Sequence, residues 1–192
     1  MTAQLIGEVD HATVRIESDR LLQRPVEKRD LGDLLDVNND DEVTRFLPYE
    51  TWNAIEDAQA WYERISRLQA EGRARQFVIV EKASGKVIGA SVIFNVDEAS
   101  ERAEVGYVLG KAYWGSGRMR EALAALLDYA FDTLKMRRVE AYADARNSAS
   151  DRLLRRLGFT CEGTLRQRSV IKGEVRDSAA YGLLRGEWTP SG

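Results

Sequence analysis

Hydrophobic side chains recur along this chain with two periods, one typical of helices and one typical of strands. Residues 53–71 carry an apolar stripe at helical spacing, and a glycine follows it as a stop signal. The stripe consists of Ile55, Ala58, Trp61, Tyr62, Ile65 and Leu68. Residues 28–38 and 40–46 show shorter stripes, and Asp40 or Asp41 is expected to cap the second. The first half of the chain therefore predicts three helices.

Other segments have the short apolar runs and the alternation of β-strands. These segments are residues 13–25, 76–81, 86–96, 100–109, 138–145, 159–170 and 174–184. The first is expected to be one long or broken strand, and Gly89 is a candidate bulge in the third. Because a helical stretch separates 100–109 from 138–145, these two strands are expected to be parallel neighbours. The pattern predicts an α/β (α+β) fold with a mixed, mostly antiparallel sheet of about seven strands, flanked by helices.

Length and composition favour one globular domain. The chain has 192 residues, of which 44% are hydrophobic and 31% charged, so residues 13–190 are expected to form one domain after a flexible segment, 1–12. The sequence contains no apolar run of membrane-spanning length and no basic, apolar leader. Cys161 is the only cysteine and cannot form an internal disulfide, which favours a cytoplasmic location.

The stretch from Ala103 to Leu134 combines a strand, a glycine-rich loop and a long helix. Gly115-Ser116-Gly117 forms the loop. The first N–H groups of a helix have no internal acceptors and lie at the positive end of the helix dipole, so this arrangement favours an anion such as a phosphate. Arg118 and Arg120 add positive charge there. The alternative is an ordinary connection whose glycines only relieve strain.

Neighbouring residues favour the phosphate site, because the segment resembles the signature of the GNAT acyl-CoA-dependent N-acetyltransferases. Tyr113-Trp114-Gly115-Ser116-Gly117 is similar to the loop of the branch that acetylates the N-termini of ribosomal proteins, while Met119 stands where that branch has a small residue. The other similar segments include 18–25, 147–150 and 162–166, so that the resemblance spans roughly residues 18–188. An ordered resemblance over this length is much more specific than one short motif.

The resemblance implies a GNAT fold, with the sheet splayed between its two central parallel strands, and acetyl-CoA as the cofactor. The glycine loop would bind the pyrophosphate, and the backbone of the preceding strand would bind the pantetheine like an added strand. Asn147 would hydrogen-bond the pantetheine, and capping of the next helix is the alternative for this residue. The implied cofactor-binding residues are Tyr107, Val108, Leu109, Trp114, Gly115, Ser116, Gly117, Arg118, Met119, Arg120 and Asn147.

Acyl transfer from a thioester to an amine needs a base for the amine and a proton donor for the thiolate. His11 and Cys161, the only histidine and cysteine, offer no nucleophilic pair, which argues for direct attack in a ternary complex. Glu104 is the candidate base, and pairing with Arg102 or with a basic residue on the opposite strand is the alternative for this carboxylate. Ser150 is the candidate proton donor, with helix capping as its alternative.

Three more positions, and a second role for Tyr107, complete the expectations for this region. Some members of the branch carry a carboxylate at the position of Ser169, and its absence here suggests a base that acts through water. Tyr107 and Tyr142 are candidates to flank the acceptor, although aromatic strand residues are usually core residues. Ser148 is expected to cap the helix that runs to Leu157.

The charge is distributed unevenly, with −7 on residues 1–100 and +4 on residues 101–192. This asymmetry fits a site where an anionic cofactor meets a cationic amine, and it does not favour nucleic acid. The expected function is an acetyl-CoA-dependent N-acetyltransferase acting on a protein N-terminus or a small-molecule amine. Transfer of another acyl group, such as succinyl, and a non-catalytic acyl-CoA-binding module are the alternatives. We expect a monomer or homodimer, with no metal and no membrane partner.

Overall fold

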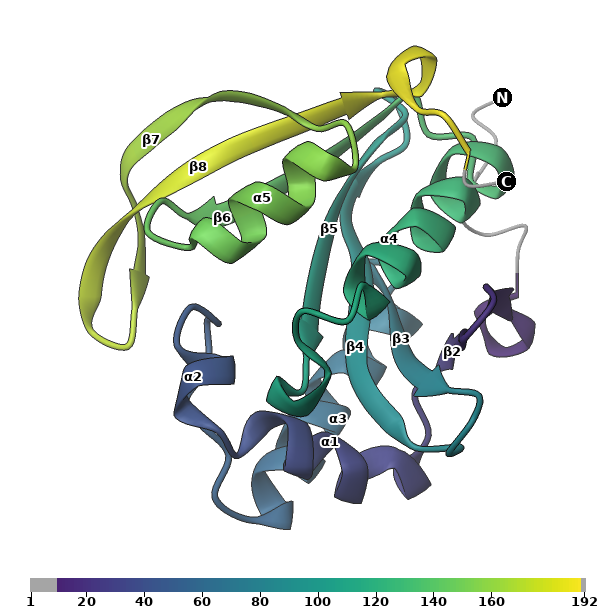
Figure 1. Ribbon diagram of the computed structural model, residues 1–192, viewed down its shortest axis with the longest axis vertical. Coiled ribbons are helices and arrows are strands. Elements are labelled where there is room, and N and C mark those ends of the chain that lie inside the picture. Colours follow the sequence, from purple (N-terminus) through teal and green to yellow (C-terminus); the bar gives the residue numbers. More distant parts are fainter. Residues whose placement is uncertain (1–9, 191–192) are drawn as a thin grey trace.

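The computed structural model describes residues 10–190, and within this range the strands form one eight-stranded sheet (Figure 1). The strand order is β1-β2-β3-β4-β5-β6-β8-β7, with every neighbouring pair antiparallel except β5 and β6. The strands are β1 Ile16–Glu17, β2 Leu21–Pro25, β3 Ala74–Glu81, β4 Val87–Asp97, β5 Arg102–Leu109, β6 Arg138–Asp144, β7 Thr160–Ile171 and β8 Glu174–Leu184. The predicted mixed, mostly antiparallel sheet is confirmed.

The helices match the predicted amphipathic segments. They are α1 Leu31–Asn38, α2 Asp41–Thr44, α3 Ile55–Ala70, α4 Arg118–Asp128 and α5 Ser148–Arg156. Asp40 caps α2 as predicted, because its side chain accepts a hydrogen bond from the N–H of Glu42. The long helix predicted to reach Leu134 ends instead in a π-helical turn, Tyr129–Thr133. The three helices predicted in the first half of the chain are therefore confirmed.

The sheet has eight strands where about seven were predicted, and the N-terminal part of the described chain accounts for the difference. The segment predicted as one long or broken strand is broken between β1 and β2, which pair with each other, with Ile16 opposite Gln23. Of the predicted flexible segment 1–12, residues 1–9 lie outside the described residues. His11 is described, and its Nε2 lies 3.1 Å from Oε1 of Gln69.

Helices cover both faces of the central strands, so β3 carries buried apolar side chains on both of its faces. On β3, Phe77 and Ile79 pack in one cluster with α4 and α5, while Val78 and Val80 pack in a second cluster with α1 and α3. All four side chains are buried. This double cover holds β4 and β5 as a rigid support for the loop that follows β5.

The parallel pair β5 and β6 separates shortly after it begins (Figure 1). The strands pair only at Arg102↔Arg138, Ala103↔Val139 and Glu104↔Glu140. Beyond Glu104, β5 continues beside β4 as far as Leu109, and β6 continues beside β8 as far as Asp144. The sheet is therefore splayed at its centre, and the second half of β5 has a strand neighbour on one side only.

Gly89 lies beside a register shift between β3 and β4, as expected for a bulge. A Cβ atom at this position would collide with the carbonyl oxygen of Val108 in β5. We expect Gly89→Ala to lower the free energy of unfolding by about 2–4 kcal/mol, because backbone on the neighbouring strand must move. Denaturant unfolding measures this change.

Gly32→Ala is the matched control for that substitution. Gly32 lies in α1, and no atom lies within 4 Å of its would-be Cβ. We expect this change to leave stability unaltered or to raise it by about 0.5–1 kcal/mol, because alanine favours the helix. Equal stability of Gly89→Ala and the wild-type protein would show that the two strands do not approach each other so closely.

Candidate active site

The N-terminus of α4 is open to an anion. Gly115 and Gly117 have φ angles of +71° and +78°, which favour glycine. Gly117 is the N-cap residue and provides no side-chain cap. Among residues 10–190, no acceptor faces the N–H groups of Arg118, Met119 and Arg120. The positive end of the helix dipole and these amides therefore have no acceptor from the described chain, and the phosphate site at this position stays a prediction.

The glycine loop is held in place from both sides. The indole Nε1 of Trp114 donates a hydrogen bond to the carbonyl of Leu109, 2.8 Å away. On the other side, Nη1 of Arg20 donates to the carbonyl of Ser116, 3.2 Å away, while its Nε donates to Glu121. These contacts fix the loop before any ligand arrives, which lowers the entropy cost of binding.

The cations near the loop differ from those that the sequence suggested. Arg118 is already paired with Glu81 through Nε at 2.9 Å, and it lies over the ring of Tyr113. Met119 is buried in the core, whereas Arg120 is exposed. Arg20 was not predicted, although it lies in a segment that resembles the family. Its approach to the loop depends on β2 lying close to α4, which sequence spacing does not reveal.

Glu104 occupies the point where β5 and β6 separate, opposite Glu140. Burial raises the pKa of Glu104, and the negative charge of Glu140 raises it further. One carboxylate oxygen accepts a hydrogen bond from Nδ2 of Asn95 at 2.9 Å. A half-buried carboxylate with a raised pKa is well suited to remove a proton near neutral pH.

The alternative of an ion pair between Glu104 and Arg102 is not realised. Arg102 instead contacts Glu140 at 3.1 Å and Asp97 at 3.4 Å. Arg138 contacts Glu140 as well, at 2.8 Å. Among the described residues, Glu104 is therefore the carboxylate at the strand separation that forms no ion pair with an arginine.

Tyr107, Ser150 and Asn147 come together on the two sides of the strand separation. Burial raises the pKa of Tyr107 to about 12, and the neighbouring Ser150 side chain partly opposes this rise. The Oδ1 atom of Asn147 accepts a hydrogen bond from the N–H of Ser150 at 3.1 Å. This arrangement joins the middle of β5 to the first turn of α5.

The N-cap of α5 is Asn147, so the prediction that Ser148 caps this helix is wrong. Ser148 already has helical geometry, whereas the longer Asn147 side chain reaches the third helical amide. The capping alternative for Asn147 is therefore realised in this structure. Whether Asn147 also contacts a cofactor stays a prediction.

The remaining candidates fall on β6 and β7. Tyr142 is exposed on β6, and the guanidinium of Arg168 lies 5.9 Å from its ring centre. Ser169 pairs with Arg176 on the β7–β8 hairpin. Cys161 is partly buried against the core. Sequence reasoning missed Arg168, because an arginine on an exposed strand gives no signal by itself.

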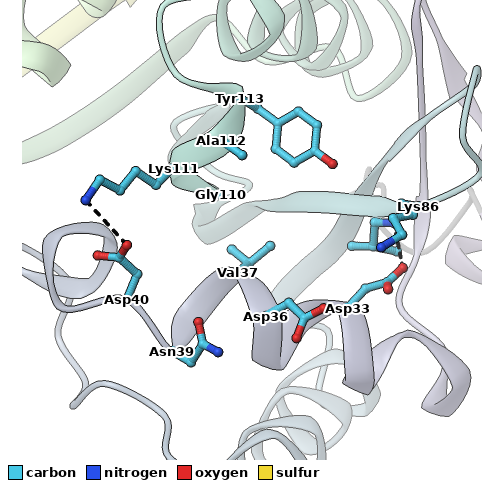
Figure 2. A pocket seen from close by; sticks show the side chains of 11 residues that line it. Asp33, Asp36, Val37, Asn39, Asp40, Lys86, Gly110, Lys111, Ala112 and Tyr113 are labelled. Atoms are coloured by element: carbon cyan, nitrogen blue, oxygen red, sulfur yellow. Dashed lines mark hydrogen bonds and ion pairs between the residues drawn. The ribbon is translucent and has the colours of Figure 1, made fainter.

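A pocket of about 270 Å³ lies beside the loop, between α1 and the segment Gly110–Tyr113 (Figure 2). Three of its charged side chains already have partners. Lys111 lies 3.7 Å from Asp40, and Asp33 accepts a hydrogen bond from the N–H of Val87. None of the predicted site residues lines this pocket. It is therefore a feature separate from the candidate site.

Within residues 10–190, no group of histidine, cysteine or acidic side chains is arranged to hold a metal ion. No helix in this range has the length and hydrophobicity needed to cross a membrane.

Comparison with known proteins identifies relatives over most of the chain. A family model described as "Acetyltransferase (GNAT) domain" matches residues 20–160. The chain is 34% identical to the "uncharacterized N-acetyltransferase p20" of Bacillus licheniformis, covering 89% of this chain and 96% of that one. It is 32% identical to the "[ribosomal protein uS5]-alanine N-acetyltransferase" of Escherichia coli, covering 92% and 94%.

More distant relatives and solved structures agree with this match. The chain is 26% identical to the spermidine N(1)-acetyltransferase of Escherichia coli, covering 81% of each chain. A crystal structure described as a probable acetyltransferase of the GNAT family from Chromobacterium violaceum superposes with a TM-score of 0.83. The identity is 30%, and the match covers 94% of this chain and 89% of that one.

Proposed function

The chain belongs to the GNAT acetyltransferase family, and we propose that it moves an acetyl group from acetyl-CoA to a primary amine by direct attack in a ternary complex. The observation that carries this proposal is the uncapped N-terminus of α4 directly after the half-free strand β5. The first element suits a pyrophosphate, and the second suits an extended pantetheine chain.

In this proposal the chain binds the donor through backbone groups. The amides of Arg118, Met119 and Arg120 hold the pyrophosphate, and Arg20 adds a positive charge at the loop. The unpaired side of β5 from Val105 to Leu109 holds the pantetheine and polarises the thioester carbonyl. Acetyl-CoA supplies the activated acyl group.

Glu104 accepts one proton from the acceptor ammonium, directly or through one water, and the neutral amine then attacks the thioester carbon. The new N–C bond forms, the C–S bond breaks, and the nitrogen loses its second proton. That proton reaches the leaving thiolate through the Ser150 hydroxyl, which gives its own proton to the sulfur and takes one from the nitrogen. The proximity of Tyr107 supports this role of Ser150, because it places the Ser150 side chain beside the part of β5 that follows the strand separation. The absence of a nucleophilic cysteine–histidine pair supports direct attack.

Ser150→Ala tests the proton donor. We expect kcat to fall by about tenfold to a hundredfold, because the thiolate then leaves without an acid. The Kd for acetyl-CoA should stay within about twofold, since the capping bond to Asn147 uses the backbone N–H of residue 150. Thiol-release kinetics and calorimetry measure the two quantities. Ser148→Ala on the same helix is the control and should keep full activity, and an unchanged kcat in Ser150→Ala would exclude the donor role.

Calorimetric titration with acetyl-CoA, followed by thiol release against a panel of amines, tests the proposed function as a whole. The panel contains a peptide N-terminus, a free amino acid and spermidine, because relatives are named for a ribosomal-protein alanine and for spermidine. Binding with turnover supports the enzyme. Binding without turnover indicates a non-catalytic module, and no binding contradicts both. Succinyl-CoA in parallel tests the choice of acyl group.

A further inference from the structure

One arginine near the candidate base has no carboxylate partner. Other arginines on β5, β6 and β8 form ion pairs, namely Arg102 with Glu140, Arg138 with Glu162, and Arg176 with Asp144. Arg168 forms none with the described residues. Its guanidinium lies over the ring of Tyr142, at 5.9 Å from the ring centre. A stacked arginine keeps its donors free at the ring edge for a second ligand.

The backbone around Arg168 is built to hold this position. β7 leaves its register with β8 between Leu165 and Ser169, and bulges of this kind re-aim side chains. Gln167 has a φ of +51°, a left-handed conformation that is costly for a residue with a side chain. Its N–H donates to Oδ1 of Asp177 at 2.7 Å, which holds the bulge in place.

Arg168 acts on the same region as the candidate base. Its positive charge interacts with both Glu104 and the hydroxyl of Tyr142. A purely cationic acceptor that approaches Glu104 is therefore repelled by Arg168. An acceptor that carries both charges satisfies the two side chains together, with its ammonium at Glu104 and an anionic group at Arg168.

We propose that Arg168 binds a carboxylate that the acceptor carries close to its reacting amine. This inference rests on the proposed function and narrows its acceptor. The enzyme then selects zwitterionic amines, either free amino acids or peptides with an acidic residue next to the N-terminus, over polyamines. The bidentate geometry of a guanidinium suits a carboxylate, and its contact with Tyr142 limits the orientations that it can adopt.

Matched acceptors test this selectivity. Three peptides differ only at their second residue, which is aspartate, asparagine or lysine, and a free amino acid is compared with its amide. We expect kcat/KM to be about tenfold higher for the aspartate peptide than for the asparagine peptide, and lowest for the lysine peptide. If kcat/KM is higher for the free amino acid than for its amide, the bound group is the α-carboxylate of a free amino acid. If only the aspartate peptide exceeds its neutral counterpart, the bound group is the side-chain carboxylate of a peptide.

Substitutions then assign the selectivity to one side chain. Arg168→Gln should raise KM about tenfold for the acidic acceptor alone, with the KM for acetyl-CoA unchanged. Arg168→Glu should invert the preference towards the lysine peptide. Arg166→Gln is the control, because Arg166 lies in the same bulge and makes no contact with Tyr142 or Glu104 that the structure describes. It should keep the wild-type preference.

Equal kcat/KM for the charged and neutral acceptors of the wild-type protein would overturn the proposal. An equal loss for all acceptors in Arg168→Gln would overturn it as well, because that result indicates a structural role. Calorimetric binding of the three peptides in the presence of coenzyme A gives the same comparison without turnover. If no acceptor is acetylated, the proposed function fails, while the binding preference still decides the role of Arg168.

Discussion

Replacing Glu104 by glutamine is expected to lower kcat by about 10²–10⁴-fold, while the Kd for acetyl-CoA stays within about twofold. Glutamine keeps the shape of the side chain and its hydrogen bond with Asn95 but cannot accept the proton. The donor site should be unaffected, because it uses the backbone of β5 and the amides of α4. Single-turnover acetylation separates this chemical step from donor binding.

The same carboxylate predicts the acidic limb of the pH–rate profile. The base works only when it is ionised, so the rate falls as pH drops through the pKa of Glu104. Burial and the charge of Glu140 raise that pKa, so the limb should lie at higher pH than for an ordinary glutamate. In Glu104→Gln this limb should disappear.

Glu140→Gln provides the matched test of the electrostatic cause. Removing the negative charge of Glu140 lowers the pKa of Glu104, so the acidic limb should move to lower pH while catalysis is retained. If Glu104→Gln kept both the wild-type rate and the acidic limb of the pH–rate profile, Glu104 would be excluded as the base.

Replacing Gly117 by aspartate is expected to weaken acetyl-CoA binding by about a hundredfold, because a carboxylate at the N-terminus of α4 repels the pyrophosphate. The side chain itself fits, since the nearest atom to a Cβ there is Nη2 of Arg20 at 3.6 Å. Asparagine and aspartate both tolerate the left-handed φ of +78° at this position.

Gly117→Asn therefore separates the effect of the charge from the effect of the side chain, because asparagine has nearly the same size as aspartate and a similar cost in the left-handed conformation. We expect its Kd to lie within about tenfold of the wild-type value. Acetyl-pantetheine, which lacks the pyrophosphate, should bind both variants equally. Calorimetry measures all of these affinities, and equal Kd values of the two variants for acetyl-CoA would show that the pyrophosphate binds elsewhere.

The local features of this protein could be predicted from its sequence, because they depend on neighbours in the chain. The apolar stripe of residues 53–71, the strand of residues 100–109 and the glycine loop at residues 115–117 depend on side-chain period and backbone preference. The parallel pairing of β5 and β6 could also be predicted from the sequence, because a helical stretch connects the two strands. These features determined the fold class and placed a candidate donor site at the start of α4.

The tertiary structure alone decided how charges are matched at the site. Arg118 pairs with Glu81, Arg20 reaches the glycine loop, and Arg102 pairs with Glu140 and leaves Glu104 without an arginine contact. Each of these contacts joins residues that are tens of positions apart, and several oppositely charged partners would fit any one of them by sequence. An ion pair depends on distance and burial, which only the packed sheet sets, whereas helices and glycine turns follow from residues next to one another.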